Sequence, residues 1–311
     1  MTVLVTGATG FVGESLCLSL MDNDYEVRAI VRRKNKAVLR GIDQFQIDDM
    51  ATHVDWSGAL NGVNVIIHAA ARAHIMDDSA KDPLAEFRAV NTVGTLALAR
   101  QAVENGVRRF VFISSIKVNG EMTKLESPFL PTDSIIPTDP YGLSKYEAEQ
   151  GLLKIAQETG IQVVIIRPPL VYGPNVRANF ASMIKWVNRE LPLPLGGIDN
   201  KRSLIALDNL VDFIICCIDH PKAVNEIFLI SDGEDTSTTE LLRKVAKAFG
   251  KKSFLLPIPV KLMRFLLSFV GKADVADRIF SSLQVDSSKS RNLLGWKPVV
   301  TMDEQLNKMA S

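Results

Sequence analysis

The sequence predicts an α/β fold, a doubly wound parallel sheet followed by a smaller C-terminal substrate-binding lobe. Strand-like apolar runs alternate with helical patterns through the first half of the chain. The runs are almost continuously apolar, which is typical of strands buried on both faces. After residue 167 prolines and glycines interrupt this alternation. With 311 residues, of which 47% are hydrophobic and 23% charged, the chain can bury a large core.

The elements of the first half follow one another in the expected order. We predict strands at 2–6, 26–32, 63–70, 109–114 and 162–167, and helices at 13–22, 83–105 and 141–159. Residues 1–167 should form the nucleotide-binding domain. Residues 168–311, with helices at 239–249 and 260–269, should form a smaller lobe that is partly interleaved with it.

Composition and charge exclude several classes of protein. The net charge of +1 provides no overall field for nucleic acid or an anionic membrane. Three cysteines show neither a disulfide framework nor metal-ligand spacing. The apolar runs are too short to span a bilayer, and the chain opens on a strand without a basic leader. We therefore expect a cytoplasmic protein with no metal, no nucleic-acid partner and no membrane insertion.

A glycine-rich turn directly follows the first strand. Gly7, Gly10 and Gly13 are spaced G-x-x-G-x-x-G and lead into a helix. Such glycines permit a tight turn and a close approach to a pyrophosphate, which the N–H groups at the helix start can bind. The alternative is a tight turn without a ligand. We predict a Rossmann-type site whose cofactor contacts here are Gly7, Thr9, Gly10, Phe11, Val12 and Gly13.

The end of the second strand bears on the choice of cofactor. An acid there would hold a ribose 2′-hydroxyl, whereas an arginine would hold a 2′-phosphate. This strand ends in Arg32, Arg33 and Lys34, with no acid. NADP(H) is therefore favoured, with NAD(H) as the alternative. Further along, Asp49 and Met50 are placed either to contact the adenine or to cap a helix.

Tyr141 and Lys145 lie four residues apart at a helix start and so share one face. We expect the lysine ammonium to lower the pKa of the phenol toward neutrality, which would let Tyr141 exchange a proton with an alcohol or ketone. Lys145 could also hold a nicotinamide ribose hydroxyl. Ser114 and Ser115 end a strand, where parallel sheets bind ligands, and can hydrogen-bond the reacting oxygen.

Together these features resemble an extended short-chain dehydrogenase/reductase of the NAD-dependent epimerase/dehydratase family. The resemblance covers nearly the whole chain. Its matching segments are TGATGFVG at 6–13, HAAA at 68–71, VNTVGT at 90–95, FISSIKVNG at 112–120, YGLSK at 141–145, RPPLVYGP at 167–174, RSLIALDNL at 202–210 and LLGWKP at 293–298.

The resemblance implies a role for each matching residue. Ser115, Tyr141 and Lys145 match the catalytic serine, the acid/base and its partner. Arg202 matches an arginine that grips the substrate diphosphate, and Asn179 lies where the substrate loop contacts the nucleotide. Further cofactor contacts would come from Tyr141, Lys145, Ala69, Ala70, Ala71, Pro168 and Asn91, the last of which supports the active-site helix.

The resemblance leaves the reaction at C4 of a UDP-sugar open. The SSIKVNGE segment resembles a subgroup of the family from bacterial O-antigen synthesis. Together with the basic strand end, it favours an NADPH-dependent reductase of a 4-keto UDP-N-acetyl-6-deoxyhexosamine, giving a product of the UDP-N-acetylquinovosamine type. The alternative is a UDP-glucose or UDP-N-acetylglucosamine 4-epimerase. A third hypothesis is a non-enzymatic cofactor sensor. The presence of both Tyr141 and Lys145 argues against it, because a sensor would not need them. The subgroup implies O-antigen synthesis, and the family implies a homodimer.

Overall fold

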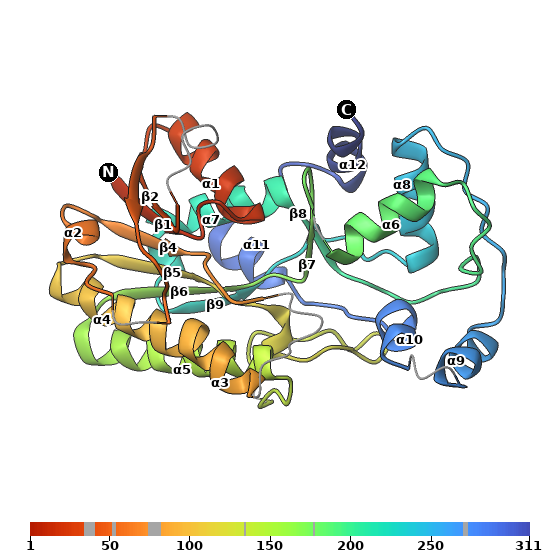
Figure 1. Ribbon diagram of the computed structural model, residues 1–311, viewed down its shortest axis with the longest axis horizontal. Coiled ribbons are helices and arrows are strands. Elements are labelled where there is room, and N and C mark those ends of the chain that lie inside the picture. The colour runs from red at the N-terminus through yellow and green to blue at the C-terminus, as the bar shows by residue number, and fades with distance from the viewer. Residues whose placement is uncertain (34–40, 52–53, 74–81, 134, 177, 270–272) are drawn as a thin grey trace.

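A computed structural model describes residues 1–33, 41–51, 54–73, 82–133, 135–176, 178–269 and 273–311 (Figure 1). The chain forms a large sheet with helices on both faces and a smaller group of helices beside it, here called the small lobe. In these ranges no helix is both long and apolar enough to cross a membrane.

The large sheet has seven strands, all parallel, in the order β3-β2-β1-β4-β5-β6-β9. The strand order reverses between β1 and β4, which makes that crevice the switch point where such sheets bind ligands. This confirms the predicted doubly wound fold. The strands are β1 Thr2–Thr6, β2 Glu26–Val31, β3 Asp43–Gln46, β4 Val65–His68, β5 Arg109–Ile113, β6 Gln162–Arg167 and β9 Glu226–Leu229.

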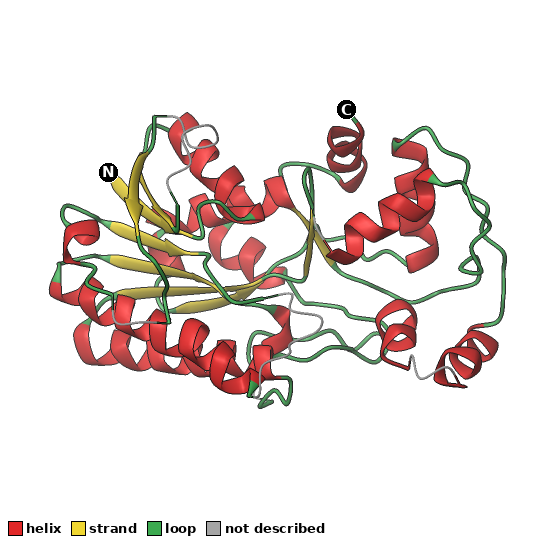
Figure 2. Cartoon of the chain, in the orientation of Figure 1, coloured by secondary structure: helices red, strands yellow, loops and turns green. Residues whose placement is uncertain are grey.

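Alternate residues of each strand feed two separate cores, since neighbouring side chains on a strand point to opposite faces. Val3 and Val5 pack under α1 (Phe11–Asp22), α7 (Leu207–Asp219) and α11 (Ser288–Leu294). Leu4 packs on the other face, under α4 (Thr95–Glu104) and α5 (Pro140–Thr159), with α2 (Ser57–Leu60) nearby (Figure 2). The predicted continuous apolar strands are therefore buried from both sides.

The helix predicted at 83–105 is continuous but not uniform. It consists of α3 (Pro83–Phe87), a π-helical segment at Arg88–Gly94, and α4. Such wide turns occur mostly at functional sites, and this one places Asn91, which is 1% exposed, against the helix α5.

The small lobe is built from residues after 167, but β9 also comes from there and completes the large sheet next to β6. A two-stranded parallel sheet, β7 (Leu170–Tyr172) and β8 (Leu204–Ala206), connects the lobe to the rest of the chain. Its helices are α6 Ala178–Asn188, α8 Thr238–Ala248, α9 Val260–Phe269, α10 Ala273–Phe280 and α12 Met302–Ala310.

Candidate active site

The residues predicted to bind cofactor gather at one edge of the sheet. The glycine turn follows β1, Arg32 and Arg33 follow β2, and Ala69–Ala71 follow β4. Ser115 follows β5 and Pro168 follows β6. The carbonyl oxygen of Pro168 accepts from the N–H of Ile116 at 3.0 Å. All these strands are parallel, so their carboxyl ends meet at the same edge.

The glycine turn leaves no room for side chains. Gly7 has φ +69°, and a Cβ on it would lie 2.8 Å from the amide nitrogen of Ala70. A Cβ on Gly13 would overlap the carbonyl oxygen of Gly7. Helix α1 starts at Phe11 after Gly10, and no side chain caps its free N–H groups. The turn therefore offers a bare backbone cradle at a helix N-terminus, which fits a pyrophosphate.

A groove of 210 Å³ opens beside this turn. It is lined by Thr9, Gly10 and Phe11 of the turn, by Pro174 and Asn175 from the loop after β7, and by residues of α1, α7 and α12: Glu14, Ser15, Leu18, Leu207, Asp208 and Lys308. The groove therefore connects the glycine turn with a segment that leads into the small lobe. A ligand that contacts both the turn and the small lobe would need such a connection.

A buried hydrogen-bond relay ties the turn's strand to the π-helical segment. The N–H of Ala70 donates to Thr6 Oγ1, 3.2 Å away, and Thr6 Oγ1 lies 2.7 Å from Nδ1 of His68. Nε2 of His68 lies 2.9 Å from Thr95 Oγ1, which donates to the carbonyl of Asn91 at 2.7 Å. Burial, with a smaller contribution from Lys145, lowers the pKa of His68 to about 3. The ring is therefore neutral, with its proton on Nε2.

Asn91 holds the start of α5 in place. Its side-chain amide donates to Ser144 Oγ at 3.0 Å and to the carbonyl of Arg72 at 3.1 Å, and its oxygen accepts from the N–H of Arg72 at 2.9 Å. All polar atoms of the side chain are thus engaged by protein. These bonds connect Asn91 to the first turns of α5.

Tyr141 and Ser115 come together at the end of β5. Asp139 caps α5 by accepting from the N–H of Gly142 at 2.7 Å, which sets Tyr141 in the first turn of the helix. Burial raises the pKa of Tyr141 to about 12, while its hydrogen bond with Ser115 works in the opposite direction. The ring also packs edge-on against Phe87, with 5.9 Å between the centroids.

The expectation that Lys145 lowers the pKa of Tyr141 is wrong for this structure. Lys145 is 1% exposed, donates to the carbonyl of Ile113 at 2.8 Å, and lies 4.2 Å above the ring of Phe112. Burial lowers the pKa of Lys145 itself to about 7, against an opposing contribution from Glu149. Desolvation therefore disfavours the charged form of both groups.

A buried ionic network beneath the site was not predicted. Glu149 accepts from Ser114 Oγ at 2.5 Å and from Nη2 of Arg167 at 2.6 Å. Arg167 also donates from Nη1 to Asn119 Oδ1 at 2.9 Å, and Asn119 in turn donates to the carbonyl of Leu130. The spacing of Lys145 and Glu149, one helical turn apart, was the available signal, since it places both on one face of α5.

Other predicted cofactor residues occupy less enclosed positions. Arg32 and Arg33 are exposed directly after β2, and Lys34 lies outside the described residues. Asp49 is exposed and accepts from the N–H of Ala51, so it serves a local turn. Met50 is buried, and its carbonyl oxygen lies 2.6 Å from where a Cβ on Gly94 would be.

The predicted substrate residues lie in the small lobe. Arg202 donates from Nη1 to the carbonyls of Arg278 at 2.9 Å and Ser281 at 3.2 Å, at the end of α10. Burial lowers its pKa. Asn179 lies in α6, and its side chain is outside the described part of the structure.

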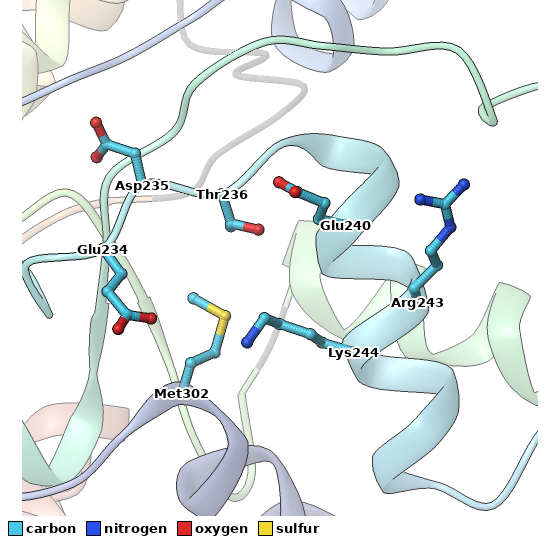
Figure 3. A pocket seen from close by; sticks show the side chains of 7 residues that line it. All are labelled: Glu234, Asp235, Thr236, Glu240, Arg243, Lys244 and Met302. Atoms are coloured by element: carbon cyan, nitrogen blue, oxygen red, sulfur yellow. The ribbon is translucent and has the colours of Figure 1, made fainter.

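A second cavity, of 360 Å³, lies in the small lobe (Figure 3). It borders Thr236, whose backbone exchanges two 3.0 Å hydrogen bonds with Arg202. Acidic and basic side chains face one another across it, so it offers a phosphate no net positive field, and we assign it no ligand. Its lining residues are Glu234, Asp235, Thr236, Glu240, Arg243, Lys244 and Met302.

Comparison with known proteins agrees with this geometry. A relative named "UDP-glucose 4-epimerase", from Vibrio cholerae, is 47% identical over 99% of this chain and 94% of its own length. An Escherichia coli O157:H7 protein named "N-acetyl-alpha-D-glucosaminyl-diphospho-ditrans,octacis-undecaprenol 4-epimerase" is 28% identical over 84% of this chain and 77% of its own.

Among solved structures, UDP-glucuronic acid 4-epimerase from Bacillus cereus in complex with NAD superposes with a TM-score of 0.79 at 23% identity, covering 100% of this chain and 96% of that one. This similarity supports the fold. The profile of the "NAD dependent epimerase/dehydratase family" matches residues 3–231. The resemblance read from the sequence is thereby confirmed, and the chain is an enzyme that belongs to the NAD-dependent epimerase/dehydratase family.

Proposed function

We propose that the chain is an NAD-dependent 4-epimerase of a UDP-linked sugar. The observation that carries this proposal is the contact of Ser115 with Tyr141, one helical turn from the buried Lys145, beside a bare glycine cradle. The names of the two relatives support it, since both specify a 4-epimerase. When bound, NAD would supply a hydride acceptor that can later return the hydride.

The glycine turn and Lys145 would hold the cofactor. The N–H groups after Gly10 would bind its pyrophosphate, and Lys145 Nζ, near the end of β5, would bind a ribose hydroxyl. The alanines after β4 would line the space between them, because the backbone of Ala69 and Ala70 lies directly against Gly7.

Tyr141 and Ser115 would handle the proton at the substrate C4 oxygen. Tyr141 would take the hydroxyl proton as hydride leaves the carbon, and would return it to the same oxygen after hydride comes back on the other face. Ser115 would hydrogen-bond that oxygen throughout. A phenol with a pKa of about 12 is protonated at neutral pH, so it must first release its own proton.

An NADPH-dependent reductase is the second candidate. It rests on Arg32 and Arg33, two exposed cations directly after β2 with no acid beside them. The relatives favour the epimerase over this reading because both carry a 4-epimerase name, and the Bacillus cereus structure holds NAD. The preference for NADP stays a prediction.

Arg202 would bind the substrate diphosphate, with Asn179 contacting the nucleotide. The guanidinium of Arg202 is fixed by two carbonyls of one helix end, which orients its remaining donors. Burial lowers the pKa of Arg202, and a dianionic diphosphate beside the guanidinium would favour its charged form again.

The proposal is tested by the cofactor that the protein retains and by the reaction that it catalyses. Purified protein is denatured and its supernatant assayed for NAD and NADP. The native protein is then given a UDP-hexose or a UDP-N-acetylhexosamine without added cofactor, beside Tyr141→Phe as control. Retained NAD and interconversion of C4 epimers are expected. An empty site, with reduction of a 4-keto UDP-sugar by NADPH, would overturn the epimerase and establish the reductase.

We also propose that the protein is a homodimer. Helices α4 and α5 lie side by side on one face of the sheet, where two copies could form a four-helix bundle (Figure 1). Size-exclusion chromatography with light scattering should give twice the chain mass of 34.2 kDa. A mass of one chain would contradict the dimer.

A further inference from the structure

Helix α9 lies at the end of the small lobe, away from the large sheet (Figure 1), and it carries exposed apolar side chains. Phe269 is 84% exposed and Phe265 65% exposed, and both belong to helix α9. Isolated exposed apolar side chains are ordinary, but a contiguous group of them marks an interaction site. We call the following residues the outer apolar surface: Phe254, Leu256, Leu262, Phe265, Leu266 and Phe269.

Helix α9 is apolar on two opposite sides, and the described part of the chain covers only one of them. Met263 and Leu267 pack against Phe280 of α10 in a small core. At 100° per residue, positions 262, 265, 266 and 269 lie on the opposite side, and all four are exposed. The apolar stripe on that side is therefore additional to what folding of the lobe requires.

The loop before α9 holds two further exposed apolar side chains in a fixed conformation. Leu193 donates to the carbonyl of Phe254 and accepts from the N–H of Leu256, both at 2.8 Å. Side chains along such an extended segment alternate, so Leu255 turns inward while Phe254 and Leu256 turn outward. The exposure of the two outer side chains is thus built into a paired backbone.

The charged residues of this part of the chain are all basic, and two of them, Lys244 and Arg264, pair with Asp303 and Asp277 from other segments. No acidic residue occurs between Glu240 and Asp274, although the chain as a whole has a net charge of only +1. Lys251, Lys252 and Lys261 are exposed in the loop and on α9. The basic residues of the segment are Arg243, Lys244, Lys247, Lys251, Lys252, Lys261, Arg264 and Lys272.

We propose that the outer apolar surface docks on an anionic phospholipid bilayer, with α9 lying in the headgroup plane. A helix with leucines and phenylalanines on one side, with exposed lysines on it and in the loop before it, has the chemistry of such interfacial contacts. A symmetric contact with a second copy would set these exposed lysines against themselves, whereas an anionic bilayer attracts them. The contact is peripheral, because ten residues of helix cannot span a membrane.

Vesicle co-sedimentation of the full chain tests this proposal. Vesicles of phosphatidylcholine alone are compared with vesicles that also contain phosphatidylglycerol. The double variant Phe265→Gln/Phe269→Gln removes the most exposed apolar side chains. Its matched control, Ile135→Gln/Ile136→Gln, changes two apolar residues elsewhere that are 61% and 63% exposed. Circular dichroism and retained cofactor verify that each variant is folded.

The wild-type chain should bind the anionic vesicles, and bind them less at high salt and less without phosphatidylglycerol. The phenylalanine variant should bind the anionic vesicles more weakly by on the order of tenfold or more. The control variant should bind them as well as the wild type does. Wild-type protein that stays in the supernatant with anionic vesicles overturns the proposal. So does a phenylalanine variant that changes from dimer to monomer in light scattering, because the surface would then belong to a second copy.

Discussion

The buried amine of Lys145 makes the stability of the protein depend on pH in a predictable direction. Its Nζ has one hydrogen-bond acceptor, the carbonyl of Ile113, and otherwise lies against the ring of Phe112. Burial lowers its pKa from 10.5 to about 7, although Glu149 opposes the shift. We predict the effect of Lys145→Met, which keeps the length of the side chain but cannot be charged.

The magnitude follows from proton linkage. Between the native and unfolded pKa values, the unfolded chain holds a proton on Lys145 that the native protein lacks. The free energy of unfolding of the wild type therefore rises by about 1.4 kcal/mol per pH unit on account of this group. Lys145→Met lacks this contribution. The variant is thus expected to lose about 2–3 kcal/mol relative to wild type between about pH 7.5 and about pH 9.5.

Urea unfolding followed by tryptophan fluorescence at several pH values measures this difference. Lys154→Met is the control, because Lys154 lies on the same helix with its side chain 72% exposed, and its stability difference from wild type should not change with pH. A Lys145→Met difference that stays constant with pH, or that moves in favour of the variant as the pH rises, would refute a neutral buried amine. It would show that Lys145 stays charged in the native protein.

Three further substitutions test the site. Gly13→Ala places a Cβ on a backbone oxygen of the turn, so the NAD content of the purified protein should fall by on the order of tenfold or more. Gly58→Ala, whose Cβ meets only ordinary contact distances, should leave the NAD content unchanged. Glu149→Gln breaks a buried ion pair and should cost about 3–5 kcal/mol in urea unfolding, while Glu147→Gln, from a surface pair, should cost about 1 kcal/mol or less. Tyr141→Phe should lower turnover roughly 10²–10⁴-fold with NAD content unchanged, and normal turnover would exclude the phenol from the chemistry.

Local patterns in the sequence predicted the fold class and several of its elements. The strands at 2–6 and 162–167 and the helix at 260–269 lie where they were expected, because apolar runs and breaks are set by neighbouring residues. The turn from Gly7 to Gly13 was predictable for the same reason, since its steric demands arise within seven residues. That the residues after the strands lie at one edge of the sheet followed from its parallel topology alone.

The protonation of the site depends on contacts between distant segments. Burial raises the pKa of Tyr141 to about 12 and lowers that of Lys145 to about 7. Tyr141 packs on Phe87 of α3 and Lys145 on Phe112 of β5, and no spacing along the chain reports the resulting desolvation. The network of Ser114, Glu149 and Arg167 joins residues up to 53 positions apart in the same way.

The surface of the small lobe shows the same division between pattern and packing. The sequence predicted α9 as an amphipathic helix, and its apolar residues could all have been assigned to the core. Folding places Met263 inside and leaves Phe265 and Phe269 in solvent, because α10 covers one side of α9 and no described segment covers the other. Periodicity identifies which residues share a face, but which face is buried depends on the elements that pack against it.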